Sequence, residues 1–426
     1  MPSEVFKAET LAMGSKSSLV VDQCQVCGDD QLESVFFLGY LPPVNQMRII
    51  NETPHEQPAY PAMVMSCPKC QLVQLGLVVD PEILFPPEYP YTSGTTRVLR
   101  ENFAEMYTEV QEKYPLVAED LVVDIGSNDG TLLSNFHNGP HRVHGVDPTD
   151  MAQLANGRGI KSTQAFFGPE SAQKVLDEDG PAKLITATNV FAHIEDVHSI
   201  VESVLRLLDD DGIFLTESHY LYSLIETLQY DTVYHEHLRH YSVHSLQYLF
   251  NMHGLEVIHV KKIPTHGGSI RVYAARIGTR DINASVNEVL QEEALIGLGV
   301  DLLEQFKERV VLSKLQLHKL LMEIKAKGES VYGIGAPSRA STLINYVGLD
   351  DGVLDCVLEI KGSYKIGKYM PGTVIPVLDE GLLFSEQPEY ALLLSWHIAD
   401  ELIPKLKEKG YKGKFIVPLP EPTIIS

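Results

Sequence analysis

From about residue 120, the sequence alternates between short apolar runs and amphipathic segments, and this pattern restricts the possible folds more than any other feature. Apolar runs joined by helical segments are typical of a parallel sheet with helices on both faces. The pattern begins again at residue 328. The expected strands are 121–125, 142–146, 184–188 and 212–217 in the first region, and 331–334, 353–358, 390–394 and 414–417 in the second. The sequence therefore predicts an α/β fold with two Rossmann-like domains.

The length of 426 residues is enough for two or three domains. Residues 283–327 are strongly helical and are interrupted by Gly297 and Gly299, so we expect two helices there. The resulting division is a flexible tail at 1–20, a small cysteine-containing module at 21–80, a central Rossmann-like domain at 81–282, a helical linker at 283–327 and a second Rossmann-like domain at 328–426.

The charge balance excludes some classes of partner. The chain has 57 acidic and 34 basic residues, for a net charge of −23. Nucleic-acid and membrane-surface binding need a cationic face, so we expect neither partner. No apolar run is long enough to span a bilayer, and residues 1–16 lack the basic and apolar segments of a secretory signal. The expectation is a cytoplasmic protein.

Four of the five cysteines form two C-x-x-C pairs. A two-residue spacing lets one tight turn direct both sulfurs at the same ion, and two such turns supply the four ligands of a tetrahedral zinc site. A closed site with four sulfurs leaves no position for substrate, so the predicted metal is one structural Zn²⁺. The expected ligands are Cys24, Cys27, Cys67 and Cys70.

A glycine-rich turn follows the first strand of the central domain. The segment Asp124-Ile-Gly126-Ser-Asn128-Asp-Gly130 joins this strand to a helix, and Asp147 ends the next strand, where a carboxylate can accept hydrogen bonds from ribose hydroxyls. An NAD-binding turn would read G-x-G-x-x-G, and this turn lacks one of those glycines. The pattern resembles the nucleoside-binding turn of class I methyltransferases, which bind S-adenosylmethionine.

The segment 231–242 is rich in histidine, tyrosine and glutamate. It does not read H-E-x-x-H, because Arg239 stands where the second histidine would be, and this disfavours a catalytic zinc. Methylation at a carbon needs a base that removes a proton next to a carbonyl and donors that stabilise the resulting enolate. Tyr234, Glu236 and His237 offer both kinds of group, since histidine is largely neutral at cellular pH. A hydrogen-bonded structural cluster is the other interpretation of this segment.

Taken together, these motifs resemble the sugar C-methyltransferases, which act on nucleotide-linked 4-keto-deoxysugars. The resemblance rests on the cysteine pairs, the turn 124–130, Asn189-x-x-x-His193, Tyr234-His-Glu-His237 and Pro264-x-His266-Gly-Gly-Ser, and it extends from about residue 22 to residue 420. It implies a zinc-binding domain, a class I methyltransferase domain and a C-terminal Rossmann-like domain, in that order. The implied substrate is a nucleotide diphosphate keto-sugar, expected to be dTDP-linked.

The resemblance also implies roles for individual residues. His237 would take the proton from C3 of the sugar, and the groups that orient the substrate and stabilise the enolate would be Tyr234, Glu236, His193 and one of Tyr89 and Tyr91. The implied cofactor-binding residues are Asp124, Gly126, Asn128, Gly130, Asp147 and Asn189, and the implied substrate-binding residues are His266, Gly335 and Arg339. A second glycine-rich turn lies in residues 331–340, where the family often has lysine and then glycine at the positions of Arg339 and Ala340 in this chain.

Three other functions remain possible on these patterns. An O- or N-methyltransferase acting on a nucleotide sugar would need no enolate. An NAD-dependent sugar-nucleotide oxidoreductase would suit two Rossmann-like domains. A zinc-dependent binding module without catalysis would leave the cluster of Tyr234, Glu236 and His237 unexplained.

Overall fold

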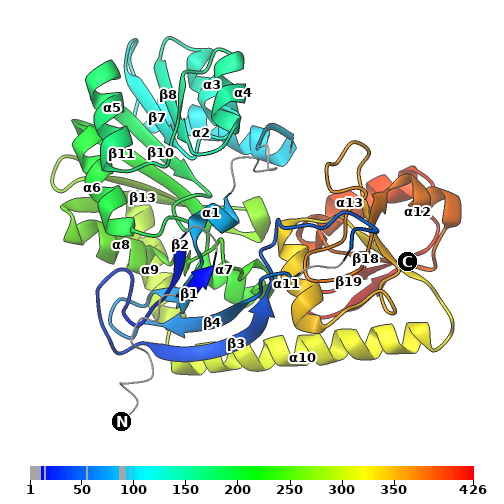
Figure 1. Cartoon of the computed structure of the whole chain (residues 1–426). Helices are drawn as coiled ribbons and strands as arrows, with labels where there is room; N and C mark the ends of the chain where they lie inside the picture. The colour runs from blue at the N-terminus through cyan, green and yellow to red at the C-terminus, as the bar shows by residue number, and fades with distance from the viewer. Residues whose placement is uncertain (1–10, 14–15, 54–55, 86–92, 96) are drawn as a thin grey trace.

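The computed structural model describes residues 11–13, 16–53, 56–85, 93–95 and 97–426. A small N-terminal module, a central domain and a C-terminal domain lie against one another, and the long helix α10 (Val300–Lys325) runs beneath the module and toward the C-terminal domain (Figure 1). Helix α10 packs on strand β3 of the module and on helix α11 (Ser338–Val347) of the C-terminal domain. None of the helices among the described residues has the length and hydropathy of a membrane span.

The N-terminal module is built on two small sheets. One is four-stranded and includes a strand from the central domain, in the order β12-β5-β4-β3. The other is three-stranded, in the order β1-β2-β6. The strands of the module are β1 (Leu11–Met13), β2 (Lys16–Val20), β3 (Glu33–Leu41), β4 (Tyr60–Ser66), β5 (Val73–Leu75) and β6 (Leu77–Val78), and the central domain supplies β12 (Arg239–His240).

The described part of segment 1–20 differs from the flexible tail that the sequence predicted. Strand β2 pairs with β6, with Leu19 opposite Val78, and Ser18 is fully buried. The run Lys16-Ser17-Ser18 is polar and gives no strand signal by itself. Its order comes from backbone hydrogen bonds to a strand some sixty residues away in the sequence.

The central domain contains a seven-stranded sheet in the order β13-β14-β11-β10-β7-β8-β9. Strands β7 to β11 are parallel, and β14 and β13 extend the sheet as an antiparallel pair. The order changes direction between β7 and β10, which is where open α/β sheets bind ligands. The strands are β7 (Leu121–Ile125), β8 (Arg142–Asp147), β9 (Ser162–Gln164), β10 (Ala182–Thr188), β11 (Leu208–His219), β13 (Leu255–Ile263) and β14 (Ser269–Arg276).

Helices and short 3-10 turns connect these strands. Most lie on the two faces of the sheet, as the alternating pattern predicted (Figure 1). They are α1 (Pro81–Leu84), η1 (Ser93–Thr95), α2 (Arg97–Lys113), α3 (Thr131–His137), α4 (Met151–Gly157), α5 (Pro169–Asp179), α6 (Val197–Leu207), α7 (Leu221–Glu226), η2 (Tyr230–Thr232), α8 (Val243–Met252) and η3 (Thr265–Gly267).

The C-terminal domain has a six-stranded sheet in the order β17-β16-β15-β18-β19-β20, with only β20 antiparallel. Two helices, α9 and α10, lead into it, as predicted for 283–327. The elements are α9 (Ala284–Ile296), β15 (Val331–Ile334), β16 (Cys356–Glu359), β17 (Val377–Asp379), α12 (Gly381–Glu386), β18 (Tyr390–Leu393), η4 (Trp396–Ile398), α13 (Ala399–Glu408), β19 (Lys414–Val417) and β20 (Thr423–Ile425).

Candidate functional site

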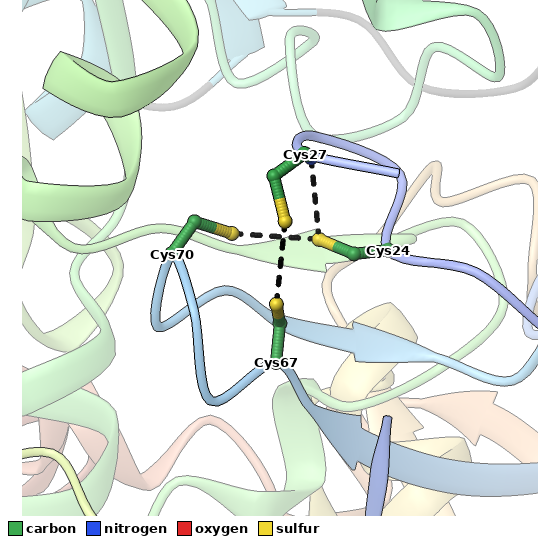
Figure 2. A group of neighbouring side chains, drawn as sticks. All are labelled: Cys24, Cys27, Cys67 and Cys70. Atoms are coloured by element: carbon green, nitrogen blue, oxygen red, sulfur yellow. Dashed lines mark hydrogen bonds between the residues drawn. The ribbon is translucent and has the colours of Figure 1, made fainter. Parts of the chain in front are cut away.

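The four cysteines of the two C-x-x-C pairs converge on one point (Figure 2). The Sγ atoms of Cys24 and Cys70 are 3.4 Å apart, as are those of Cys27 and Cys67, and all four sulfurs lie within 4.8 Å of one another. A tetrahedral zinc with Zn–S bonds of about 2.3 Å needs sulfurs roughly 3.8 Å apart. The arrangement therefore fits one zinc ion, held by four sulfurs.

The first glycine-rich turn lies at the C-terminal end of β7, where the strand order changes direction. Gly126 and Gly130 have φ angles of +68° and +76°, and Asn128 is also left-handed, with φ of +48°. A Cβ atom on Gly126 would come within 2.7 Å of Val190 Cγ2. Asn189, with φ of +55°, ends the neighbouring strand β10 on the same edge of the sheet. The structure therefore brings these four predicted cofactor-binding residues to one side of the sheet.

Two buried carboxylates support this turn. Asp124 accepts a hydrogen bond from Thr186 Oγ1 at 2.7 Å, and its burial raises the pKa of this carboxyl group to about 7. Asp147 accepts a bond from the backbone N–H of Asn128 at 2.9 Å and another from the N–H of Thr149 at 2.9 Å. Asp147 thus holds the turn in place, and a ribose hydroxyl would use the remaining lone pairs of its two oxygens.

Aromatic side chains from several elements surround His237. The ring centroid of His237 lies 4.1 Å from that of Tyr234, 4.9 Å from that of His193 and 5.0 Å from that of His219. The ring of His266, from turn η3, lies 5.4 Å from that of His219. The structure therefore brings together His193, Tyr234, His237 and His266, which come from segments spread over more than seventy residues.

One hydrogen bond fixes the orientation of His237. Its Nδ1 lies 2.7 Å from the carbonyl oxygen of Thr232. Because a carbonyl can only accept, Nδ1 carries the proton and Nε2 of the neutral ring has a lone pair. Burial, followed by the nearby His193 and His240, holds the pKa of His237 well below its usual value of 6.5, so this ring is neutral at pH 7. Burial also lowers the pKa of His193 and of His266 to about 4.

Glu236 lies where the three parts of the chain meet. Asn45 of the N-terminal module donates a 2.8 Å hydrogen bond to Glu236 Oε1 of the central domain. Ser338 Oγ, at the start of α11 in the C-terminal domain, lies 3.5 Å from Asn45 Oδ1. The small module thus contributes a side chain to the surroundings of the histidine-rich segment.

The second glycine-rich turn faces the same region. Gly335 has φ of +80°, and a Cβ atom there would come within 2.5 Å of Ser395 Oγ. Arg339 donates to both carboxylate oxygens of Asp231, at 2.8 and 2.7 Å, and is buried. The resemblance implied that Arg339 binds substrate; in the structure helix α11 packs against η2, and the guanidinium of Arg339 is paired with a buried carboxylate. Tyr89 and Tyr91 lie outside the described residues.

Sequence reasoning missed three residues of this region. His219 lies at the end of β11, two residues beyond the predicted strand, and the tendency of ligand-binding groups to follow strand ends could have identified it. Asp231 and Asn45 had no such signal, since their partners belong to other domains.

Comparison with known proteins agrees with this geometry. The chain is 34% identical to the C-methyltransferase NovU of Streptomyces niveus over 410 residues, which cover 95% of this chain and 97% of that protein. This chain belongs to the C-methyltransferase family. Three family models match successive regions of the chain: "Putative zinc binding domain" at residues 24–85, "Methyltransferase domain" at 95–260 and "C-methyltransferase C-terminal domain" at 264–420. The protein is therefore an S-adenosylmethionine-dependent C-methyltransferase, and not an oxidoreductase or a non-catalytic module.

Two more distant relatives each match only part of the chain. The uncharacterized methyltransferase YcgJ of Bacillus subtilis is 31% identical over 108 residues, which cover 24% of this chain and 42% of that protein. The crystal structure of YcgJ aligns with a TM-score of 0.33 and 17% identity, covering 42% of this chain and 99% of that chain. Magnesium protoporphyrin IX methyltransferase from Synechocystis PCC 6803 aligns with a TM-score of 0.34 and 15% identity, covering 43% and 88% of the two chains.

Proposed function

We propose that this enzyme transfers a methyl group to C3 of a nucleotide-linked 4-keto-deoxysugar through an enolate, as a step in branched-sugar biosynthesis. The observation that carries this proposal is the state of His237. Its ring is buried and neutral, and the Thr232 carbonyl at 2.7 Å keeps the proton on Nδ1. A ring held in this way presents Nε2 as a base, which a carbon nucleophile needs and an alcohol or amine nucleophile does not.

The proton transfer can be written with the residues of this chain. His237 Nε2 takes the proton from C3, the electrons of the C3–H bond form a C3–C4 double bond, and the negative charge moves to the C4 oxygen. His193 and Tyr234, close to the ring of His237, would orient the ketone and donate to that oxygen. Glu236 would hold a sugar hydroxyl. Either Tyr89 or Tyr91 would complete the site.

The cofactor would bind at the first glycine-rich turn. S-Adenosylmethionine supplies an electrophilic methyl group when bound, and the residues that would hold it are Asp124, Gly126, Asn128, Gly130, Asp147 and Asn189. These residues fit a nucleoside cofactor, because two glycines and an asparagine in left-handed conformations leave the end of β7 open to close backbone approach. The four cysteines would hold one structural zinc, which has no open position for substrate.

The nucleotide diphosphate would lie against the second glycine-rich turn. Gly335 permits the left-handed backbone of this turn, and the N-terminus of α11 follows within three residues. His266 would contact the sugar from the opposite loop. We expect a dTDP-linked substrate and a cytoplasmic enzyme, with neither nucleic acid nor membrane as a partner.

The substitution His237→Ala tests the base. We expect solvent deuterium exchange at C3 of a 4-keto sugar nucleotide to fall by at least ~100-fold, which is the usual contribution of a general base. Isothermal titration should show unchanged S-adenosylmethionine affinity. His244→Ala is the matched control, since this half-buried histidine lies two residues after the histidine-rich segment and outside the cluster around His237. Normal exchange in His237→Ala would show that another group is the base.

A second experiment tests the class of acceptor. The enzyme would be offered dTDP- and UDP-linked 4-keto-deoxysugars and the same sugars with the ketone reduced. We expect methylated product only from the ketones, with a new carbon-bound methyl signal and loss of the C3 proton in the NMR spectrum. Transfer to an oxygen or nitrogen of the reduced sugars would contradict the proposal and favour an O- or N-methyltransferase.

A further inference from the structure

We infer that Asp231 and Arg339 are positioning residues through which the C-terminal domain sets the orientation of the base, His237. The inference rests on the proposed function for the role of His237 as a base. The contacts themselves do not depend on the identity of the substrate. They form a continuous path from helix α11 to the imidazole ring.

The path begins at the ring and leads to turn η2. The Thr232 carbonyl that holds His237 Nδ1 belongs to this turn, and Asp231 is the residue before it. The turn is short and closed by its own backbone bonds, from Thr232 N to Gln229 O at 3.0 Å and from Val233 N to Tyr230 O at 3.0 Å. A movement of the Asp231 side chain would therefore shift the Thr232 carbonyl.

The carboxylate of Asp231 is held from the C-terminal domain. Arg339 donates two hydrogen bonds to it, from Nε at 2.8 Å and from Nη2 at 2.7 Å, and Trp396 donates a third from Nε1 at 2.7 Å. Among the described residues, these two are the donors to this carboxylate. The guanidinium also lies over the indole ring, 4.8 Å from its centroid, and Asp231 is fully buried. A paired and planar contact of this kind fixes direction as well as charge.

The same guanidinium reaches a second loop of the site. Arg339 Nη2 also donates to Gln229 Oε1 at 3.2 Å, and Gln229 Nε2 donates to the Gly267 carbonyl at 2.6 Å. His266, which precedes Gly267, has a left-handed backbone with φ of +57°. One arginine of the C-terminal domain is thus connected to the loop that carries His237 and to the turn that carries His266.

This arrangement predicts an effect on the chemical step and not on cofactor binding. The S-adenosylmethionine turn at Gly126 makes none of these contacts. A base displaced by about 1 Å can lower the rate by roughly 100-fold, because proton transfer depends on distance and direction. Loss of the hydrogen bonds from Arg339 to Asp231 should therefore lower kcat while the KM for S-adenosylmethionine stays within about threefold.

The experiment compares Arg339→Gln with Arg309→Gln. Arg309 also bridges the domains, since it lies on α10 and donates to the carbonyl of Ile225 at 3.0 Å and to that of Glu226 at 2.9 Å, but these carbonyls are not in the loop of His237. We expect kcat to fall by about 100-fold in Arg339→Gln and by less than about threefold in Arg309→Gln. Equal losses in the two variants would overturn the inference.

Two spectroscopic readouts need no substrate. Trp396 is the only tryptophan in the chain, so its fluorescence emission reports whether the contacts of Asp231 with Trp396 and Arg339 are intact. Nitrogen NMR of histidine-labelled protein, assigned with His237→Gln, reports which ring nitrogen carries the proton. We expect wild type to show the Nδ1–H form of His237 and Arg339→Gln to show a mixture of the two tautomers. A changed tryptophan signal with an unchanged His237 signal would overturn the inference.

The double variant Asp231→Asn/Arg339→Gln protects the test from misfolding, because it leaves no unpaired buried charge. We expect it to fold and to show the same loss of kcat and the same tautomer mixture as Arg339→Gln. A folded double variant with the wild-type His237 spectrum and kcat would overturn the inference. If wild type shows the Nδ1–H form but methylates none of the 4-keto sugars, the proposed function fails and the positional link between Arg339 and His237 stands.

Discussion

The two glycine-rich turns of this enzyme have the same backbone plan. The N–H of Gly126 donates to the carbonyl of Val146 on the neighbouring strand at 2.8 Å, and the N–H of Gly335 donates to that of Leu358 at 2.8 Å. In each turn an acidic residue at the end of that neighbouring strand accepts a backbone N–H. The two pairs are Asn128 N with Asp147 Oδ2 at 2.9 Å and Ala336 N with Glu359 Oε1 at 2.6 Å.

The turns differ in the packing of the helix that each one starts. After Gly130, helix α3 packs on strands of its own domain. After Gly335, helix α11 packs against η2 of the central domain and extends Arg339 to Asp231. The backbone conformation of a glycine-rich turn therefore does not by itself determine which ligand or contact the turn serves. The first turn is proposed to bind the cofactor alone, whereas the second, proposed to bind the substrate diphosphate, also begins a helix that makes a contact between domains.

The largest effect that we expect comes from a substitution outside both turns. Cys67→Ser should lose the zinc and the soluble protein, because a structural zinc site contributes roughly 10 kcal/mol or more to folding. Metal content and soluble yield measure this. Cys356→Ser, in strand β16 beneath the second turn, is the control and should keep one zinc per chain. A folded, metal-free and active Cys67→Ser protein would contradict the structural-metal proposal.

Replacing Gly126 or Gly335 with alanine tests the role of each turn separately. Gly126→Ala should weaken S-adenosylmethionine binding by about 10- to 100-fold, because a left-handed alanine costs roughly 1–2 kcal/mol and its Cβ would also meet Val190. Isothermal titration measures the affinity. Gly335→Ala should leave this affinity within about threefold and raise the KM for the sugar nucleotide. Equal losses of cofactor affinity in both variants would remove the distinction between the turns.

Asp147 and Glu359, which each accept a backbone N–H from one of the turns, allow a comparison with smaller expected effects. Asp147→Asn should weaken S-adenosylmethionine binding by about 10-fold, since one carboxylate oxygen that accepts a backbone N–H is replaced by an amide NH2 donor and a hydrogen bond to a charged group is lost. Glu359→Gln should leave cofactor affinity unchanged and raise the KM for the sugar nucleotide by a similar factor. Cofactor titration and initial-rate kinetics on the same preparations measure both quantities. A change in cofactor affinity for Glu359→Gln would show that the second turn also affects the first.

The smallest effect that we expect on activity is its dependence on pH. His237 must be neutral to act as a base, and burial and the nearby rings of His193, His240 and His266 keep its pKa below 6.5. The neutral form therefore persists to lower pH. Between pH 7.5 and 6.0 we expect kcat/KM to fall by less than about twofold, whereas a histidine with an ordinary pKa would lose roughly fourfold. A fourfold loss in stably folded enzyme would contradict the buried, neutral base.

The same histidines predict weaker folding in acid. Below pH 6.5 the unfolded chain binds protons at His193 and His266, whereas the folded chain, with pKa values of about 4 at these rings, does not. The free energy of unfolding should therefore fall as the pH is lowered from 6.5 toward 4, by up to about 1.4 kcal/mol per pH unit for each such histidine. Denaturant titrations at several pH values measure this. A constant stability over that range would show that these rings are protonated in the folded enzyme.

The parts of the structure that depend on local sequence could be predicted. Strands 121–125, 331–334 and 414–417 begin and end where expected, because buried parallel strands appear as short apolar runs between turn residues. The convergence of Cys24 with Cys70 follows from the spacing of two knuckles. These features need only neighbouring residues to be recognised.

The parts that depend on packing between domains could not be predicted. Strand β12 has two residues and gives no periodic signal, yet it completes the sheet of the N-terminal module. Arg339 and Asp231 are 108 residues apart in the sequence, and an arginine beside a glycine-rich turn suggests a phosphate more readily than a buried carboxylate. Asn45 likewise gives no signal in the sequence, because its partners Glu236 and Ser338 belong to the two other domains.

The hydrogen bond between His237 and the Thr232 carbonyl has a stereochemical consequence. The hydrogen bond at Nδ1 restricts the orientation of the imidazole, so in the proposed reaction Nε2 would approach a bound sugar along one line. Only a hydrogen on the near face of the ring carbon lies on that line. Of two sugars that are epimers at this carbon and otherwise alike, the enzyme should enolise one and leave the other intact.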